Sequence, residues 1–173
     1  MNENIETSIG LVKIRKAGIE DEEAVLEIMR DAAKWLREKG IPQWAGVLTN
    51  RGQEIVHQRV KDSDAYVVQC NGEKIGTVSI MWEDTLGWDE KGLDGSAGYV
   101  HGLAILRRFA GKKIGLDILK WAIETIRAER PYVRLDCMAE NPKLCQIYEN
   151  IGFSKVGEKI LPKDLKVNLY QKN

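Results

Sequence analysis

The sequence lacks the features of a membrane-bound or secreted protein. It contains no apolar run near the roughly 20 residues that a helix needs to cross a bilayer. Its first residues include Glu3 and Glu6 and do not show the basic and apolar regions of a signal peptide. We therefore expect no membrane partner and a cytoplasmic location.

Cysteine is scarce, and neither sign of charge is in excess. The three cysteines, Cys70, Cys137 and Cys145, are odd in number and form no Cys-x-x-Cys pair, so we expect neither a disulfide nor a metal site. The 26 basic residues are balanced by 26 acidic ones, which argues against a broad nucleic-acid-binding surface. An RNA-binding α+β domain would also need aromatic residues on an open sheet face, and we find none. We expect no nucleic-acid partner.

Two nucleotide-binding signatures are missing as well. The sequence has no Gly-x-x-x-x-Gly-Lys-Ser/Thr and no Gly-x-Gly-x-x-Gly that opens a helix after a strand. These absences argue against a kinase, a nucleotide hydrolase or a dinucleotide-dependent enzyme. What the sequence does have, over residues 100–115, is an apolar strand, then a basic turn that contains glycine, then the start of a helix.

The 100–115 segment is the outline of an anion-binding site. The first turn of a helix leaves backbone N–H groups unpaired, and its dipole places about half a positive charge there. Gly111 lets the backbone approach a ligand closely, and Gly115 lets the helix pack close to the sheet. The added positive charge comes from Arg107, Arg108, Lys112 and Lys113. The segment therefore predicts a phosphate-binding loop.

Length and composition fit one compact domain over residues 1–173. A chain of 173 residues is within the usual domain range and buries about two-thirds of its unfolded surface. Hydrophobic residues make up 43% and charged residues 30%, which is not the composition of a disordered chain. No linker or repeat interrupts the sequence.

Hydrophobic periodicity predicts the order of strands and helices. The expected strands are 11–15, 65–70, 75–82, 99–106, 132–138, 153–160 and 165–171. The expected helices are one that begins at 20–23 and stops at Gly40, one over 53–61, one over 112–127 and one from Asn141 to Gly152. Asn71-Gly72 predicts a hairpin turn, and 83–98 is expected to be a flexible loop. The result is a mixed α+β domain with helices over a twisted sheet.

Two motifs carry a resemblance to a known family. Arg108-x-x-Gly111 before a basic helix start is similar to the coenzyme A pyrophosphate loop of the GNAT superfamily, the acyl-CoA-dependent N-acyltransferases, although Lys113 stands where that family usually has Gly or Ala. The segment from Asn141 to Phe153 is similar to the family's Asn-x-x-Ala-x-x-Leu-Tyr-x-x-x-Gly-Phe helix, with Cys145 in place of a small residue. The predicted element order matches the GNAT fold, a mixed and mostly antiparallel twisted sheet flanked by helices, over nearly the whole chain.

The resemblance implies a reaction and a set of binding residues. The reaction would be acetyl transfer from acetyl-CoA, without a metal, to a primary amine of a small molecule or peptide, and a homodimer is left open. The residues that would bind the cofactor are Leu103, Ala104, Ile105, Arg108, Phe109, Ala110, Gly111, Lys112, Lys113, Ile114, Gly115 and Asn141. The backbone of the first three would pair with the pantetheine arm, which requires a bulge in that strand.

Acetyl transfer to an amine also needs an acid and a base. The amine must lose a proton, and the leaving thiolate benefits from a proton donor. Tyr148 is the donor that the family resemblance implies, although its helical face also predicts a core aromatic. His101 is the candidate base because it lies on the strand before the phosphate loop, and Glu83 and Asp84 are alternatives.

The acceptor site and one rival function remain open. Tryptophan faces attract ammonium groups, so Trp35, Trp44, Trp82 and Trp88 could bind an amine, but a packed aromatic core explains them as well. The rival is a degenerate domain of the same fold that binds acyl-CoA or a partner protein without turnover. Lys113 favours this rival, and Tyr148 favours the enzyme.

Overall fold

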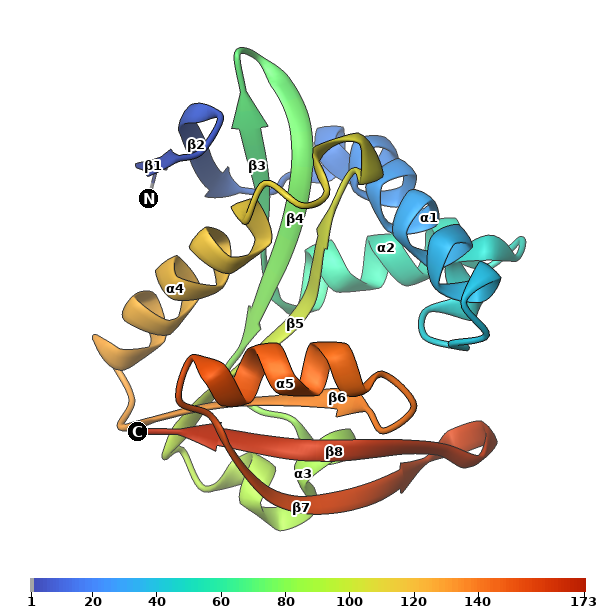
Figure 1. The fold of residues 1–173 in the computed structure, drawn as a ribbon, viewed down its shortest axis with the longest axis vertical. Helices are drawn as coiled ribbons and strands as arrows, with labels where there is room; N and C mark the ends of the chain where they lie inside the picture. Colours follow the sequence, from blue (N-terminus) through green and yellow to red (C-terminus); the bar gives the residue numbers. More distant parts are fainter. Residues whose placement is uncertain (1) are drawn as a thin grey trace. The chain divides into compact units, whose positions relative to one another are not determined.

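The computed structural model describes residues 2–173, which divide into two compact units. The first comprises the chain up to Ile80 together with Gly102–Ala122, and the second comprises Met81–His101 with Ile123–Asn173. Strand β5 (Ala97–Ile105) and helix α4 (Ile114–Arg127) each contribute residues to both units (Figure 1).

The first unit contains an antiparallel meander. Strands β1 (Asn2–Thr7), β2 (Gly10–Lys16), β3 (Asp64–Cys70) and β4 (Glu73–Met81) pair in chain order, and β5 follows β4. The turn between β3 and β4 has positive φ at both Asn71 (49°) and Gly72 (83°), as a two-residue type I′ hairpin requires. The hairpin predicted from Asn71-Gly72 is confirmed.

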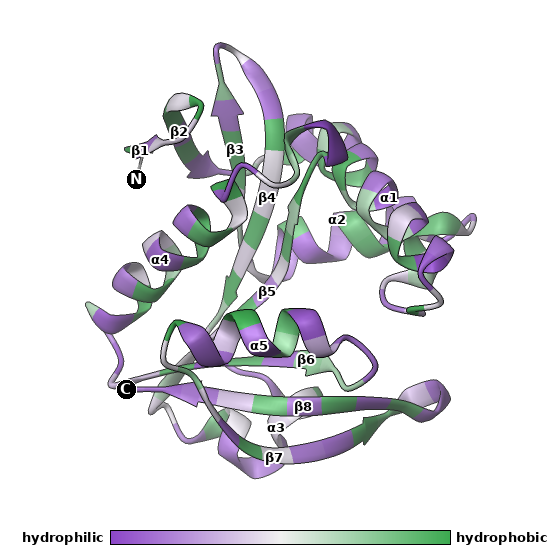
Figure 2. Ribbon diagram, viewed as in Figure 1, coloured by the Kyte–Doolittle hydropathy of each residue, from purple (hydrophilic) through white to green (hydrophobic). Residues whose placement is uncertain are grey.

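Helices α1 (Glu22–Glu38) and α2 (Gly52–Asp62) cover the sheet of the first unit. Figure 2 shows hydrophilic and hydrophobic residues on different faces of α1. Its buried face places Val25 and Met29 in a core with Val56 of α2 and Val67 of β3. The helical spacing of these apolar residues is therefore explained by burial against one sheet face, which is the main stabilising contribution to a helix of this kind.

The second unit continues the sheet in the order β5, β6 (Tyr132–Met138), β8 (Leu165–Lys172), β7 (Ser154–Leu161). Strand β6 is parallel to β5, and the registered pairs run only from Ala97 with Tyr132 to Tyr99 with Arg134. The other pairs are antiparallel. Helix α5 (Pro142–Asn150) begins at Asn141, whose side chain accepts a hydrogen bond from the Leu144 amide at 3.2 Å. The predicted cap at Asn141 is confirmed.

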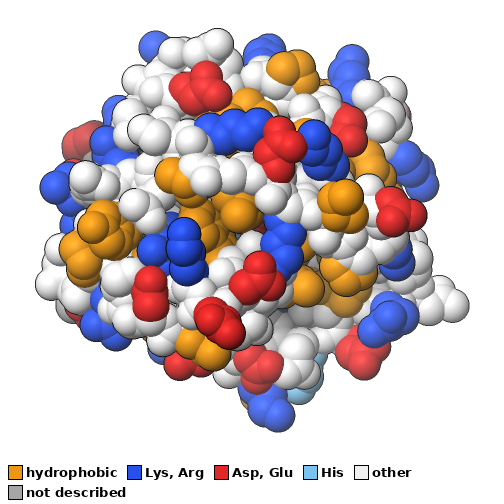
Figure 3. Space-filling model, turned by 90° about the horizontal axis from the view of Figure 1, so that it is seen from below, with side chains coloured by type: hydrophobic (Ala, Val, Ile, Leu, Met, Phe, Trp, Pro, Cys, Tyr) orange, Lys and Arg blue, Asp and Glu red, His pale blue; other side chains and the backbone are white. Residues whose placement is uncertain are grey.

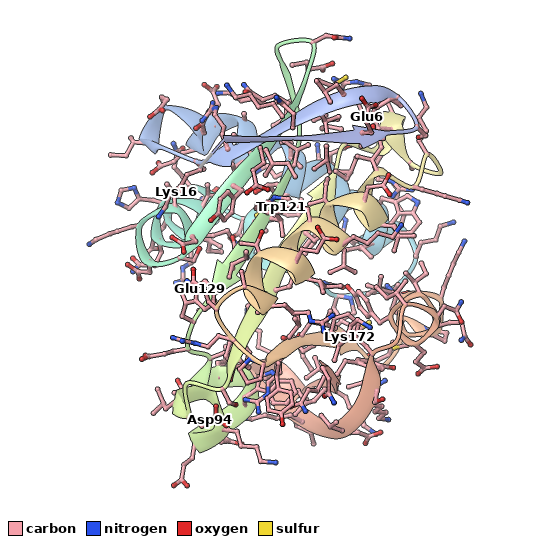
Figure 4. The ribbon with its side chains drawn as sticks, turned by 90° about the vertical axis from the view of Figure 1, so that its left-hand side faces the viewer. Glu6, Lys16, Asp94, Trp121, Glu129 and Lys172 are labelled. Atoms are coloured by element: carbon pink, nitrogen blue, oxygen red, sulfur yellow. The ribbon has the colours of Figure 1, made fainter. Side chains whose placement is uncertain are left out.

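Helix α4 buries the face that its sequence predicts. Ile114, Ile118, Trp121 and Ala122 are all buried. Trp121, labelled in Figure 4, packs edge-on against Tyr66 of β3 with ring centroids 4.9 Å apart. This contact packs the middle of α4 against β3.

Two elements differ from the prediction. The segment 83–98, expected as a flexible loop, contains helix α3 (Thr85–Trp88) and a 3-10 turn over Asp89–Leu93, because Asp84 caps α3 through the Gly87 amide at 2.9 Å and Trp88 is buried. Strand β1 was not expected, because its residues are mostly polar; it forms by backbone pairing with β2 along its whole length.

No helix among the described residues is long and apolar enough to cross a membrane. Figure 3 shows one face of the molecule, on which Lys and Arg side chains lie interspersed with Asp and Glu and with hydrophobic groups. The mixture agrees with the balanced charge of the sequence.

Candidate functional site

The predicted phosphate loop lies in the first unit, between β5 and α4. Its residues are a short 3-10 turn over Arg107–Phe109, then Ala110 to Lys113, then the first turn of α4. Gly111, Lys112 and Lys113 are exposed, whereas Ile114 is 1% exposed and anchors the loop to the core. The loop is therefore open to a ligand while its end is held in place.

The backbone amides of this loop are the main feature of the site. The amides of the preceding turn are paired, since Phe109 donates to Leu106 and Ala110 to Arg107, both at 2.9 Å. Pairing resumes with Leu116. Between them, none of the described residues accepts a hydrogen bond from the five consecutive amides of 111–115. Five unpaired donors at a helix N-terminus, where the dipole is positive, form a site for an anion with several oxygens.

Lys113, the departure from the family pattern, has a backbone explanation. Its φ is +59°, and that of Gly111 is +79°, so both residues adopt the left-handed conformation. Glycine reaches this region without strain, but a residue with a β-carbon pays roughly 1 kcal/mol or more. Lys113 therefore adopts, at some cost, a conformation that a glycine would reach without strain.

The basic side chains of the loop are not all available to a ligand. The Arg107 guanidinium stacks 4.0 Å from the centroid of the Trp35 ring, and its backbone amide donates to Asp31 at 2.6 Å. Arg108 forms an ion pair with Glu73. Among residues 2–173, no carboxylate pairs with Lys112 or Lys113. The two lysines are thus the cations most accessible beside the unpaired amides.

Strand β5 changes conformation just before the predicted pantetheine-binding residues. Gly102 has φ +57°, an irregularity inside a strand that the sequence could not show. Leu103 and Ile105 are half-buried and Ala104 is buried, and the strand ends where the Leu106 amide donates to Ile75 of β4 at 2.9 Å. Gly102 therefore places an irregular backbone conformation directly before Leu103.

His101 lies between two carboxylates in the second unit. Its Nε2 is 3.0 Å from Oδ2 of Asp84, and its Nδ1 is 3.8 Å from Oδ2 of Asp136. Burial would raise the pKa of Asp84, but the hydrogen bond and charge of His101, together with the Gly87 amide and the charge of Lys159, lower it. At Asp136 burial prevails and raises the pKa. An ionised Asp84 can orient the imidazole and stabilise its protonated form, so this pair is suited to accept a proton.

Asp84, His101 and Asp136 are also residue types that can bind a metal ion. Their donor atoms all lie within 4.8 Å of one another, a spacing that could hold one cation. The direct hydrogen bond between His101 and Asp84 accounts for the closest contact without an ion. Glu83, the other candidate base, is exposed and is outside this cluster.

Tyr148 lies on α5 in the second unit with its ring in the core. The ring packs against Phe153 and Tyr170, with centroids 6.0 Å away in both cases. Burial raises the pKa of its phenol, and the charge of Asp136 raises it further. The hydroxyl has no hydrogen-bond partner among residues 2–173. Tyr148 therefore holds its proton at neutral pH.

Cys145 and the tryptophans have structural surroundings. The Sγ of buried Cys145 is 3.6 Å from that of Cys137, and neither thiol is oxidised. Trp88 lies in a core with Tyr99, and Trp44 packs against the core of α1 and α2. The packed-core explanation therefore accounts for two of the four tryptophans that the sequence singled out.

The structure groups the predicted residues in two places and adds others. The loop with Leu103 to Ile105 belongs to the first unit, and His101, Asn141 and Tyr148 belong to the second. Asp136 was not predicted, because a single acidic residue in a strand carries no signal until its neighbours in space are known. Gly102 was also missed, since a lone glycine in a strand indicates a bulge only weakly.

Comparison with known proteins is consistent along the whole chain. The model of the Acetyltransferase (GNAT) family matches residues 42–153. An uncharacterized N-acetyltransferase of Bacillus subtilis strain 168, YesJ, is 33% identical over 146 residues, 80% of this chain and 79% of that protein. The S-(2-succino)cysteine N-acetyltransferase of the same organism is 25% identical over 154 residues, 87% of this chain and 89% of that protein. A GNAT-family acetyltransferase structure from Listeria monocytogenes 4b F2365 superposes with a TM-score of 0.79 at 27% identity, covering 98% of this chain and 99% of that one.

Proposed function

Because this chain belongs to the GNAT acetyltransferase family, and is thereby an acetyl-CoA-dependent N-acetyltransferase, we propose that it acetylates a primary amine of a small molecule or peptide by direct attack. Tyr148 is the proposed general acid and His101 the proposed base. The observation that carries the proposal is the run of five unpaired amides at 111–115. We also propose that both units form a single domain, since the matched residues 42–153 include segments of each.

The residues present fit coenzyme A. The unpaired amides and the N-terminus of α4 would hold its diphosphate, with Lys112 and Lys113 beside it. The backbone of Leu103, Ala104 and Ile105, after the irregularity at Gly102, would pair with the pantetheine arm. Phe109, Ala110, Arg108 and Asn141 complete the proposed set. When bound, acetyl-CoA supplies the activated acyl group.

The proposed acid and base both belong to the second unit. His101 takes the proton of the attacking amine, and Asp84, ionised at 3.0 Å from Nε2, stabilises the imidazolium that results. Tyr148 keeps its proton because burial raises its pKa, so the hydroxyl is able to donate to the leaving sulfur. Asp136 is within 3.8 Å of His101 and acts electrostatically on Tyr148.

One relative supports a small acceptor. The S-(2-succino)cysteine N-acetyltransferase is named for a small amine substrate, and the similarity to it covers 87% of this chain. On that support we place a small molecule ahead of a peptide as the acceptor.

Replacement of Tyr148 by phenylalanine tests the mechanism. Tyr148→Phe removes only the hydroxyl, so turnover with an acceptor found by an amine screen should fall roughly tenfold or more while the affinity for acetyl-CoA stays the same. Tyr132→Phe, a half-buried tyrosine on β6, is the matched control and should leave turnover unchanged. Equal turnover by the wild type and Tyr148→Phe would remove Tyr148 from the mechanism.

A further inference from the structure

Arg59, near the C-terminal end of α2, is a charged residue that the folded chain does not neutralise. The guanidinium has one hydrogen bond, from Nη1 to the Ser79 hydroxyl of β4 at 3.4 Å. Its Nε is buried and unpaired, and no carboxylate of residues 2–173 lies within ion-pair distance. The side chain as a whole is half-buried.

The backbone of β5 is shaped around this guanidinium. A β-carbon at Gly102 would overlap Nη1 of Arg59 and would lie 2.6 Å from its central carbon. Gly102 also adopts φ +57°, which a glycine reaches without strain. All three residues belong to the first unit. The strand thus accommodates the arginine at the position directly before Leu103.

Ser79 adds a second unsatisfied donor. It is 1% exposed, and its oxygen accepts from Arg59, so its own O–H remains free to donate. None of the described residues accepts that proton. A guanidinium and a hydroxyl that both lack an acceptor, at the same place, are complementary to an anion with two oxygens.

The Arg59 guanidinium is charged at neutral pH, and its burial destabilises the folded protein. Burial lowers its pKa to about 10, so the guanidinium remains charged at neutral pH. A buried charge without a partner destabilises the folded protein, and structural arginines normally avoid this cost by pairing. One guanidinium balances one carboxylate, whereas a phosphate dianion would leave a charge uncompensated. The missing partner is therefore best explained as a carboxylate that arrives with a ligand.

We propose that Arg59, assisted by Ser79, binds the carboxylate of the acceptor, and that the acceptor is consequently an amine that carries a carboxylate, such as an amino acid. This inference rests on the proposed function, because the next residue along β5, Leu103, begins the backbone segment assigned to the acyl donor. Consecutive Cα atoms are 3.8 Å apart, so a carboxylate at Gly102 places an amine a few bonds away close to that segment.

A stability measurement tests the proposal without any substrate. If Arg59 awaits a ligand, Arg59→Met removes an unpaired buried charge, and the melting temperature of the free protein should rise by about 2 to 4 °C. Arg51→Met, at the exposed end of the same helix, is the matched control and should change it little. A melting temperature that falls on Arg59→Met would assign Arg59 a structural role and overturn the proposal.

A matched panel of amines tests the substrate class. L-amino acids and ω-amino acids are compared with their carboxamides and their decarboxylated amines, and acetyl transfer is followed by thiol release. At least one carboxylate should be used with a kcat/KM at least about tenfold above both of its matched analogues. In Arg59→Lys and Arg59→Gln the KM for that acceptor should rise about tenfold or more, with kcat and acetyl-CoA affinity changed much less.

The outcomes separate this inference from the proposed function. Three results would overturn the carboxylate assignment without affecting acetyl-CoA binding. The first is equal use of carboxylates and their analogues, and the second is no turnover of any panel member by protein that binds acetyl-CoA. The third is an unchanged KM in both Arg59 variants. Loss of acetyl-CoA binding itself, or an unchanged rate in Tyr148→Phe, would contradict the proposed function instead. Wild-type behaviour of Arg51→Met in the same assays supports the assignment to Arg59.

Discussion

His101, on strand β5, has a carboxylate near each of its two ring nitrogens. It contacts Asp84, whose pKa its own hydrogen bond and charge help to lower, and it faces Asp136, whose pKa burial raises. The two carboxyls therefore differ in protonation tendency although they flank one ring. The hydrogen bond to ionised Asp84 fixes the orientation of the ring, which suits it to proton exchange.

His101→Gln should lower kcat/KM roughly 100-fold at neutral pH, because the base is lost while the amide preserves the contact with Asp84. The acidic limb of the pH–rate profile should disappear at the same time, which a merely structural histidine would not cause. The other histidine of the chain, His57, is about half exposed and pairs with Glu22, so His57→Gln is the control. A full acidic limb in His101→Gln would assign the base elsewhere.

At the residue scale the sequence predicted the motif positions but not their neighbours. Tyr148, Gly111 and Asn141 could be identified because each lies in a local pattern with a local physical reason. The pairing of His101 with Asp136, and of Arg59 with Ser79 and Gly102, joins residues far apart in the chain. Local spacing carries no information on such contacts, so only the fold could reveal them.

Asp21 connects three elements of the first unit. Its carboxylate, fully buried, accepts two hydrogen bonds from Arg15 of β2 at 2.6 and 2.8 Å, and it pairs with Lys74 of β4 at 2.6 Å. It also accepts from the Gly18 amide at the turn before α1. The hydrogen bonds from Arg15 above all hold the pKa of Asp21 well below its usual range. The start of α1 is thereby fastened to two strands.

Asp21→Asn should lower the free energy of unfolding by about 3 kcal/mol at pH 7, because two cations lose a buried partner. Since the folded-state pKa is lowered, the contribution of Asp21 is complete above the unfolded pKa of about 4 and is lost as pH falls below it. Urea titrations at pH 7 and pH 3 should therefore show the difference between wild type and variant shrinking at the lower pH.

Glu54→Gln provides the comparison for this measurement. Glu54 pairs with Arg51 at an exposed site on α2, so its loss should cost less than about 1 kcal/mol. An Asp21→Asn variant as stable as Glu54→Gln at pH 7, or a difference that does not shrink toward pH 3, would contradict the role assigned to the buried carboxylate.

At the element scale, the bounds of helices and strands could be predicted from the sequence where burial of one face gives the apolar residues a regular spacing. Strand β6 has the predicted bounds, and α1, α2, α4 and α5 begin within two residues of their expected positions. Strand β1 escaped prediction because its pairing is made by the backbone and its side chains are mostly polar. The structure of segment 83–98 was not predicted because a residue distant in the sequence, Arg134, helps to hold it. The Arg134 guanidinium lies 5.0 Å from the centroid of the Trp88 ring and donates to the Lys91 carbonyl at 2.9 Å.

At the scale of the whole molecule, charge is balanced overall and concentrated locally. The chain carries 26 basic and 26 acidic residues. The unpaired amides of 111–115 and two lysines without a carboxylate partner, Lys112 and Lys113, are nevertheless gathered in one loop. We therefore propose that an anion is bound by the arrangement of this loop and not by a general positive field. This difference is what separates binding of coenzyme A from non-specific binding of polyanions, and it can be measured directly.

The most direct measurement is a calorimetric titration of the wild-type protein and of Gly111→Glu with acetyl-CoA, with ATP and NAD as controls. Gly72→Glu is the matched variant, because Gly72 also has positive φ (83°) and open space beside it but lies in a hairpin turn. We predict selective micromolar binding by the wild type and Gly72→Glu, and none by Gly111→Glu. Undiminished binding by Gly111→Glu would show that the loop is not the diphosphate site, and no binding by the wild type would favour a partner-binding domain over an enzyme.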